Sequence, residues 1–165
     1  MTTTTTPSIP TMETSPLART LREQQGANSD LVLIVDDVPD NLAVLHDALD
    51  ESGYTVLIAT NGEQALQRAA QARPDIVLLD AMMPGIDGFE VARRLKADAA
   101  TAHIPIVFMT GLTETEHLVA ALEAGGVDYV TKPIKPKEVL ARMNVHLQGA
   151  RRARQDAQQA GQARN

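Results

Sequence analysis

The sequence predicts an α/β fold in which a doubly wound parallel sheet of five strands carries helices on both faces. Two features of the chain support this prediction. Short aliphatic runs alternate with segments of helical periodicity at a repeat of roughly 20 to 25 residues, which is typical of successive strand–helix units. The runs are apolar throughout, which is typical of strands that a parallel sheet buries on both faces. The 165 residues suffice for a single domain of this kind with tails.

The expected strands are short, and they span residues 31–35, 54–59, 76–80, 104–109 and 127–131. A segment with Leu, Val or Ala at helical spacing follows each strand, so five helices are expected. Residues that start or stop helices occupy the boundaries: Asn61 as an N-cap, capping boxes at Asp87–Glu90 and Thr113–Glu116, Gly53 and Gly125–Gly126 as stops, and Pro136 at a first helical position.

Composition divides the chain into three parts. Residues 1–28 are rich in Thr and Pro and cannot bury enough apolar surface to offset their ordering entropy, which predicts a disordered tail. Residues 29–148 form the expected domain, and residues 149–165, rich in Ala, Gln and Arg, are expected to prolong the last helix as a linker or tail. This helix is either simply solvated or a signalling helix that pairs in a dimer and leads into an output domain. The second interpretation rests on a weak coiled-coil-like seam: Leu140, Met143, Leu147, Ala150, Arg154 and Ala157.

Composition also excludes several classes of function. The absence of cysteine excludes disulfides, thiolate metal sites and cysteine nucleophiles. No apolar run approaches the roughly 20 residues of a membrane span and no signal peptide is recognisable, so a cytoplasmic protein is expected. The domain holds 18 acidic and nine basic side chains, which argues against direct nucleic-acid binding through phosphates. Only residues 149–165 are basic, and the arginines at 151–154 are weak support for such binding.

Polar side chains gather at the carboxyl ends of four of the five expected strands: Asp36 and Asp37, Asp80, Thr110 and Lys132. In a parallel sheet these ends meet at one edge, where open α/β sheets bind their ligands. Each residue alone has an ordinary explanation, such as a helix-capping turn for Asp36-Asp37 or a solvated surface position for Lys132. Together they predict a site that holds three carboxylates. Two carboxylates about 4 Å apart repel by roughly 1 kcal/mol in water and about 4 kcal/mol at an effective dielectric near 20. Such a cluster needs a cation, and an all-oxygen set favours Mg²⁺.

With these residues in place, the sequence resembles the receiver domain of two-component response regulators, the CheY-like fold with flavodoxin-like strand order. The matching segments are Val35-Asp36-Asp37, Leu78-Leu79-Asp80-Ala81-Met82-Met83-Pro84-Gly85-Ile86-Asp87-Gly88, Met109-Thr110-Gly111 and Tyr129-Val130-Thr131-Lys132-Pro133, in the expected order over about residues 30–148.

The resemblance implies that Asp80 accepts a phosphoryl group from a sensor histidine kinase or histidine phosphotransfer protein. It implies that Mg²⁺ is bound by Asp37, Asp80 and the backbone carbonyl of Met82, with Asp36 acting through a water ligand. Thr110 and Lys132 would hold the phosphoryl oxygens. The Lys132-Pro133 bond is expected to be cis.

The resemblance also implies how the signal leaves the site. Phosphorylation would draw Thr110 inward and move Tyr129, which occupies the family's aromatic switch position. The face built by the helix at 113–123, the strand at 127–131 and the last helix would change, and it could form a homodimer. Met82 and Leu112 stand at positions that tune hydrolysis and are apolar, which predicts slow self-dephosphorylation by a switch that is not an enzyme acting on a diffusible substrate.

Two alternative functions each need a feature that this sequence lacks, and a third stays open. A phosphotransferase of the haloacid-dehalogenase type needs a second Asp two residues after its nucleophile, where this chain has Met82. A flavodoxin-like cofactor module needs a phosphate loop after the first strand, where Asp36-Asp37 would repel a phosphate. A receiver-shaped binding module that is never phosphorylated stays open. The four histidines, at 46, 103, 117 and 146, form no constellation in the sequence.

Overall fold

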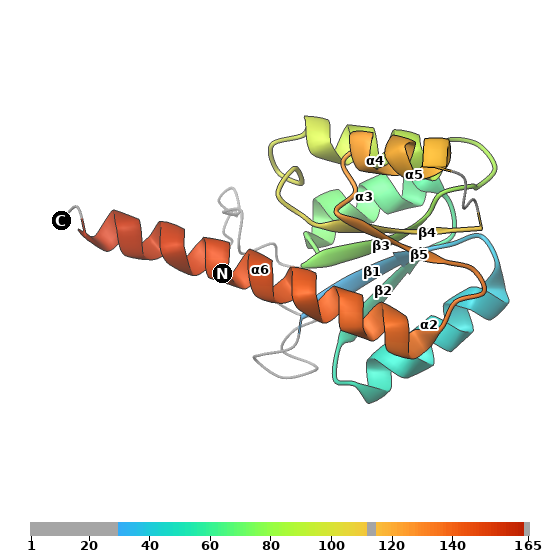
Figure 1. The fold of residues 1–165 in the computed structure, drawn as a ribbon, viewed down its shortest axis with the longest axis horizontal. Helices are drawn as coiled ribbons and strands as arrows, with labels where there is room; N and C mark the ends of the chain where they lie inside the picture. The colour runs from blue at the N-terminus through green and yellow to red at the C-terminus, as the bar shows by residue number, and fades with distance from the viewer. Residues whose placement is uncertain (1–29, 112–114, 164–165) are drawn as a thin grey trace, which may run out of the picture.

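The computed structural model describes residues 30–111 and 115–163, with side chains through residue 150 and that of Arg152. The predicted fold is confirmed: five parallel strands form one sheet in the order β2-β1-β3-β4-β5 (Figure 1). The strands are β1 (Leu31–Val35), β2 (Thr55–Ala59), β3 (Ile76–Asp80), β4 (Ile106–Thr110) and β5 (Asp128–Thr131). The expected N-terminal tail, Leu112 and the start of the capping box at Thr113 lie outside the described residues.

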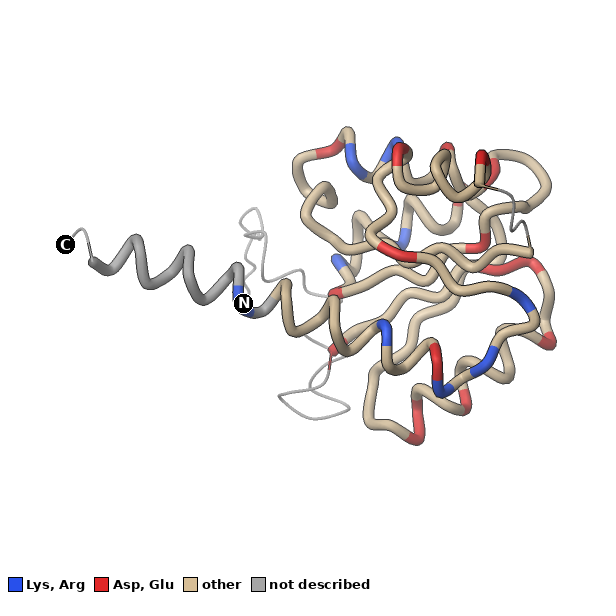
Figure 2. Tube along the Cα trace, in the orientation of Figure 1, with Lys and Arg blue, Asp and Glu red and all other residues tan. Residues whose placement is uncertain are grey.

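Helices cover both faces of the sheet and complete three layers. They are α2 (Pro39–Glu51), α3 (Gly62–Ala72), α4 (Gly88–Ala97), α5 (Thr115–Glu123) and α6 (Pro136–Ala163). Figure 1 shows α3, α4 and α5 on one face, and α2 and α6 on the other, and the Cα trace in Figure 2 has the same layers. None of the helices in the described part of the chain is long and apolar enough to cross a membrane.

The two faces of the sheet have differently built cores. Every residue of β1, β3 and β4 is buried, as the apolar runs predict, and alternate residues of each strand face opposite layers. Towards α3, α4 and α5, these helices and the turn after α5 contribute mainly small side chains: Ala65, Ala69, Ala92, Ala121 and Ala124. Towards α2 and α6 they contribute larger ones: Leu42, Leu45, Leu49, Val139, Met143 and Leu147. Burial of each such large side chain contributes about 1.5–3 kcal/mol.

The predicted helix caps are largely confirmed. Asn61 accepts a hydrogen bond from the Gln64 amide at 2.8 Å, and Asp87 accepts one from the Glu90 amide at 2.9 Å. The second hydrogen bond of the predicted Asp87–Glu90 capping box, from the Asp87 amide to the Glu90 carboxylate, was wrong. The Glu90 carboxylate instead accepts hydrogen bonds from Arg93 and Arg94, one turn further along the same helix.

The last helix continues through residue 163, so residues 149–163 prolong it as predicted. It extends away from the domain in Figure 1. The first part of the predicted coiled-coil seam is not available for pairing: Met143 and Leu147 are buried against the sheet, and Leu140 packs against the same cluster. The three- and four-residue spacing there reflects burial within the domain, which has the same period as a coiled coil.

Polar and charged side chains of α6 contact the first residue of β5. The Asp128 carboxylate accepts hydrogen bonds from Arg142 at 3.0 Å and lies 3.0 Å from His146 Nε2. Burial alone would raise the pKa of Asp128, but the bonds from His146, the Tyr129 amide and Arg142 outweigh it and lower the pKa. His146 therefore belongs to a contact between α6 and β5 that its sequence position did not reveal.

Candidate functional site

The strand order brings the predicted site residues to one edge of the sheet. β1 pairs with β3, β3 with β4, and β4 with β5, so the four polar strand ends are successive neighbours. Asp80 is the last residue of β3 and Thr110 the last of β4, while Asp36 and Lys132 directly follow β1 and β5. β1 and β3 are neighbours, but the chain leaves β1 towards β2 on one side and leaves β3 towards β4 on the other. Doubly wound sheets bind ligands at such a switch point, outside the carboxyl ends of the strands.

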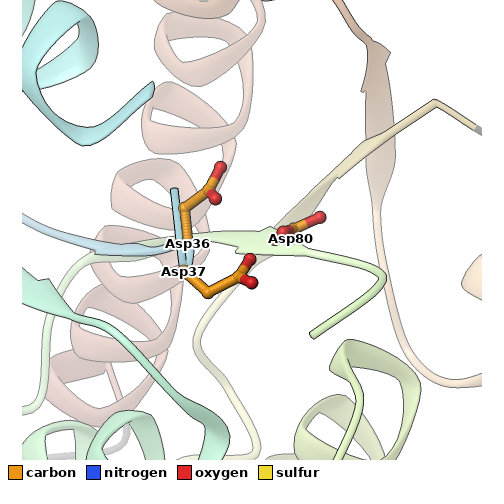
Figure 3. A group of neighbouring side chains, drawn as sticks. All are labelled: Asp36, Asp37 and Asp80. Carbon is orange, nitrogen blue, oxygen red and sulfur yellow. The ribbon is translucent and has the colours of Figure 1, made fainter. Parts of the chain in front are cut away.

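Three carboxylates form the centre of this edge (Figure 3). Oxygens of Asp36, Asp37 and Asp80 all lie within 4.8 Å of one another. Asp36 is fully buried and Asp80 is 2% exposed, whereas Asp37 is exposed. Figure 3 shows the carboxylates of Asp37 and Asp80 directed towards the space between them. Three negative charges at such separations repel, and a cation between them would relieve the repulsion.

Lys132 is the cationic group that the site itself supplies. Its Nζ donates to Asp80 Oδ1 at 3.0 Å and lies 3.8 Å from Asp36 Oδ2. The Lys132 amide donates to the Thr110 carbonyl at 2.9 Å, which fixes the backbone at the end of β5 against β4. The Lys132-Pro133 peptide bond is cis, as the resemblance implied. Thr110 is 3% exposed and lies beside Thr131 in the strand register.

Asp80 has an unusual acidity for an aspartate. Burial raises its pKa, the hydrogen bond from Lys132 lowers it, and the nearby Asp36 raises it again, with a net value of about 6. The Met82 amide also donates to Asp80 Oδ1, at 3.3 Å. One lysine therefore does not compensate the buried negative charge, and further positive charge would favour the ionised carboxylate.

The donor set fits Mg²⁺. All three side chains are carboxylates, two are buried at the sheet edge, and oxygen is the ligand that Mg²⁺ prefers. The predicted fourth ligand, the carbonyl of Met82, follows Asp80 by two residues in the loop after β3. Met82 is 56% exposed.

Sequence reasoning missed two residues that shape this site. Asn41, in the first turn of α2, donates from Nδ2 to Asp36 Oδ2 at 3.1 Å. Gly88, the first residue of α4, packs so closely under β3 that a Cβ there would lie 2.1 Å from the Asp80 carbonyl oxygen. Asn41 follows Asp36 by five residues and precedes a buried leucine, a signal that helical geometry could have used. The contact at Gly88 depends on how α4 meets the sheet, which the sequence pattern does not specify.

A doubly wound sheet with an acidic pocket and a lysine at its carboxyl edge defines the CheY-like class of α/β proteins. The chain belongs to the response regulator receiver domain family, whose model matches residues 32–144. Receiver domains are phospho-accepting switches of two-component systems, not enzymes in the ordinary sense.

Individual relatives agree with this assignment. The chain is 43% identical over 116 residues to the DNA-binding response regulator MtrA of Mycolicibacterium smegmatis, matching 70% of this chain and 50% of MtrA. It is 45% identical over 112 residues to the response regulator PleD of Caulobacter vibrioides, matching 68% of this chain and 25% of PleD. The chain thus spans only half or a quarter of these relatives.

A solved structure shares the fold and has a metal in its site. The receiver domain of the sensor histidine kinase PA1611 from Pseudomonas aeruginosa was crystallised with a magnesium ion coordinated in its active-site cleft. It superposes with a TM-score of 0.68 at 29% identity, covering 72% of this chain and 98% of that one.

Proposed function

We propose that this chain is the phospho-accepting receiver of a two-component phosphorelay and that Asp80 takes the phosphoryl group. The donor is a phosphohistidine on a sensor histidine kinase or a histidine phosphotransfer protein. The observation that carries the proposal is the Lys132–Asp80 contact of 3.0 Å inside a group of three carboxylates at the sheet edge. An acceptor, a counter-charge and a cation-binding set are the requirements of phosphoryl transfer.

In the proposed reaction an Asp80 oxygen attacks phosphorus while the phosphorus–nitrogen bond breaks and its electron pair returns to the imidazole. Oδ1 is held by Lys132 and the Met82 amide, so we assign the attack to Oδ2. Lys132 and the Thr110 hydroxyl then hold phosphoryl oxygens. Asp37, Asp80 and the Met82 carbonyl would bind Mg²⁺ directly, and Asp36 through water. Bound Mg²⁺ would supply positive charge that the single lysine does not provide.

The signal would leave through β5. Phe108 is the partner of Tyr129 in the β4–β5 pairing, and the buried Thr110 lies two residues beyond Phe108 on β4. Tyr129 is partly buried against the core shared by α3, α4 and α5. Movement of Thr110 towards the phosphoryl group would free space for the Tyr129 ring and alter the face formed by α5, β5 and α6.

This face supports a proposed homodimer. Val119 and Leu122 on α5 and Val127 before β5 are exposed large apolar side chains, at 45%, 51% and 43%. Their burial against a second copy would remove apolar surface from water. We further propose that residues 29–148 are the input part of a longer regulator, with residues 149–165 as a helical linker, because the relatives extend well beyond the matched region.

The phosphorylated form is proposed to be long-lived. Met82 stands beside Asp80 with 56% of its surface exposed and offers a thioether, which is a weak hydrogen-bond acceptor and cannot donate. It would therefore not orient a water molecule for attack on the aspartyl phosphate. A phosphoryl half-life of seconds in the purified protein would contradict this part of the proposal.

The test is incubation of the protein with Mg²⁺ and a small phosphodonor, followed by intact-mass measurement. The wild type should gain the mass of one phosphoryl group, Asp80→Asn should gain none, and Asp47→Asn, an exposed aspartate of α2, should behave as the wild type. A gain that persists in Asp80→Asn would refute the assignment. Rapid turnover of the donor without a stable adduct would instead favour a haloacid-dehalogenase-like phosphotransferase, and no gain in any variant would favour a binding module that is not phosphorylated.

A further inference from the structure

Asp36 is held by two different donors, one on each oxygen. Its Oδ1 accepts the Val38 amide at 2.9 Å, which closes the turn after β1. Its Oδ2 accepts the side-chain amide of Asn41 at 3.1 Å. Asp36 is fully buried, and a buried carboxylate that loses a donor becomes much less stable. If either hydrogen bond were lost, a contact between Asp36 and another nearby donor would become more favourable.

The nearest cationic partner is Lys132. Its Nζ lies 3.8 Å from the same Oδ2 that Asn41 occupies, and 3.0 Å from Asp80 Oδ1. Asn41 and Lys132 thus approach one oxygen of Asp36 from different elements. Because Asn41 satisfies that oxygen with a neutral donor, Lys132 can stay with Asp80 without leaving Asp36 unpaired.

The fold holds Asn41 in this position. Pro39 begins α2, and the Asn41 and Leu42 amides both donate to the Val38 carbonyl, at 3.1 and 3.3 Å. Leu45 is one turn beyond Asn41 and 1% exposed, so the helix presents both side chains towards the sheet. The packing of α2 therefore sets the direction of the Asn41 amide before any ligand binds.

We propose that Asn41 is a positioning residue of the phosphorylation site. Its amide occupies Asp36 Oδ2, keeps Lys132 on Asp80, and leaves the remaining lone pairs of Asp36 directed at the cation. This inference rests on the proposed function, because it takes Asp80 as the acceptor and the three carboxylates as the Mg²⁺ site. Without Asn41, Lys132 shifts towards Asp36, where it competes with Mg²⁺ and no longer neutralises Asp80.

The first measurement is Mg²⁺ affinity of the unphosphorylated protein by calorimetric titration. Asn41→Leu, which keeps similar size and removes the donor, should weaken Mg²⁺ binding about tenfold, the low end of the range for residues that orient metal ligands. Asn41→Gln, which retains an amide, should recover most of the affinity. Asn61→Ala is the control at another helix start, since Asn61 accepts the Gln64 amide as the N-cap of α3 and is not part of the site, and it should leave Mg²⁺ affinity unchanged.

The second measurement separates positioning from a purely structural role. In a Lys132→Met background, Asn41→Leu should change Mg²⁺ affinity by no more than about twofold, because the competing cation is gone. An equal loss in both backgrounds would overturn the proposal, as would an Asn41→Leu affinity within about twofold of the wild type. If Asn41→Leu does not fold, Asn41→Ser replaces it in the same cycle.

Failure of this inference is distinguishable from failure of the proposed function. If Asp80 is phosphorylated and Asn41→Leu binds Mg²⁺ normally, the role of Asn41 is refuted and the receiver function stands. If Asn41→Leu weakens Mg²⁺ binding through Lys132 but Asp80 gains no phosphoryl group, the positioning role stands and the receiver function is refuted.

Discussion

Gly88 provides a sharp test of how α4 supports the phosphorylation site. A Cβ at this position would lie 2.1 Å from the Asp80 carbonyl oxygen and 2.9 Å from the Ala81 Cα. Both are backbone atoms, so no side chain can turn aside to make room. The Gly88 amide also donates to the Ala81 carbonyl at 3.0 Å, which joins the helix start to the loop after β3. Gly88→Ala must therefore displace either α4 or the end of β3.

The two contributions to the stability of Gly88→Ala have opposite signs. Relief of the overlap requires a shift of about 1 Å in packed backbone, and overpacking of this kind costs about 1–3 kcal/mol. Alanine in a helix gains at most about 1 kcal/mol over glycine, and less at the first helical residue. The packing loss is larger, because Val91, Ala92 and Leu95 fix α4 against the core. We expect a net loss of about 1–2 kcal/mol.

Urea unfolding followed by circular dichroism measures this difference, with Gly149→Ala as the matched control. Gly149 is also helical, but no atom beyond the adjoining helix backbone and its chain neighbours lies within 4 Å of its would-be Cβ, so alanine there should stabilise the protein by about 0.5–1 kcal/mol. Phosphorylation of Gly88→Ala should also slow, since Asp80 is displaced. A Gly88→Ala protein as stable as the wild type would refute the packing argument.

Three further predictions concern other parts of the structure. Asp128→Asn should lower stability by about 1–2 kcal/mol at neutral pH. Because the pKa of Asp128 is lowered in the folded state, its contribution to stability is present above about pH 4 and is lost as the pH falls through the folded pKa. The urea midpoints of the variant and the wild type should therefore converge in acid, and a constant difference between them would contradict this. Lys96→Met should cost about 1–3 kcal/mol, because Lys96 Nζ donates to the Ala102 and Ile104 carbonyls at 2.9 and 2.7 Å, whereas the exposed Lys137→Met should be neutral in the same unfolding assay. Mg²⁺ at a hundred times its Kd should stabilise the wild type by about 2.7 kcal/mol, and Asp37→Asn should lose most of this gain in thermal melts at the same Mg²⁺ concentration.

The sequence was sufficient to predict the strand ends because two independent patterns coincide there. Buried parallel strands are apolar along their whole length, so a carboxylate such as Asp80 marks where the strand meets solvent. Parallel pairing then brings all such ends to one edge, whichever helix lies between them. To tell which strand ends are neighbours, the strand order was also needed, and the family resemblance supplied it.

The contacts that sequence reasoning missed depend on side chains from separate helices. Lys96 reaches carbonyls in the connection to β4, and His146 reaches Asp128 on β5, 18 residues away. A lysine or histidine on an amphipathic helix does not indicate whether its side chain contacts solvent or a distant group of the same chain. Asn41 is different, since its partner lies only five residues away, and a model of the first turn of α2 would have suggested it.

The first half of the seam on α6 was misassigned because packing against the sheet and packing in a coiled coil have the same periodicity. Leu140, Met143 and Leu147 repeat at spacings of three and four whether they face a partner helix or their own sheet, and here they face the sheet. Beyond Leu147 the chain consists mostly of strong helix formers, with Gly149 as a local weakness. The docked half of α6 already supplies the costly helix nucleus, so the extension needs only propagation. A partner that binds residues 149–163 would therefore meet a helix whose direction the domain has already set.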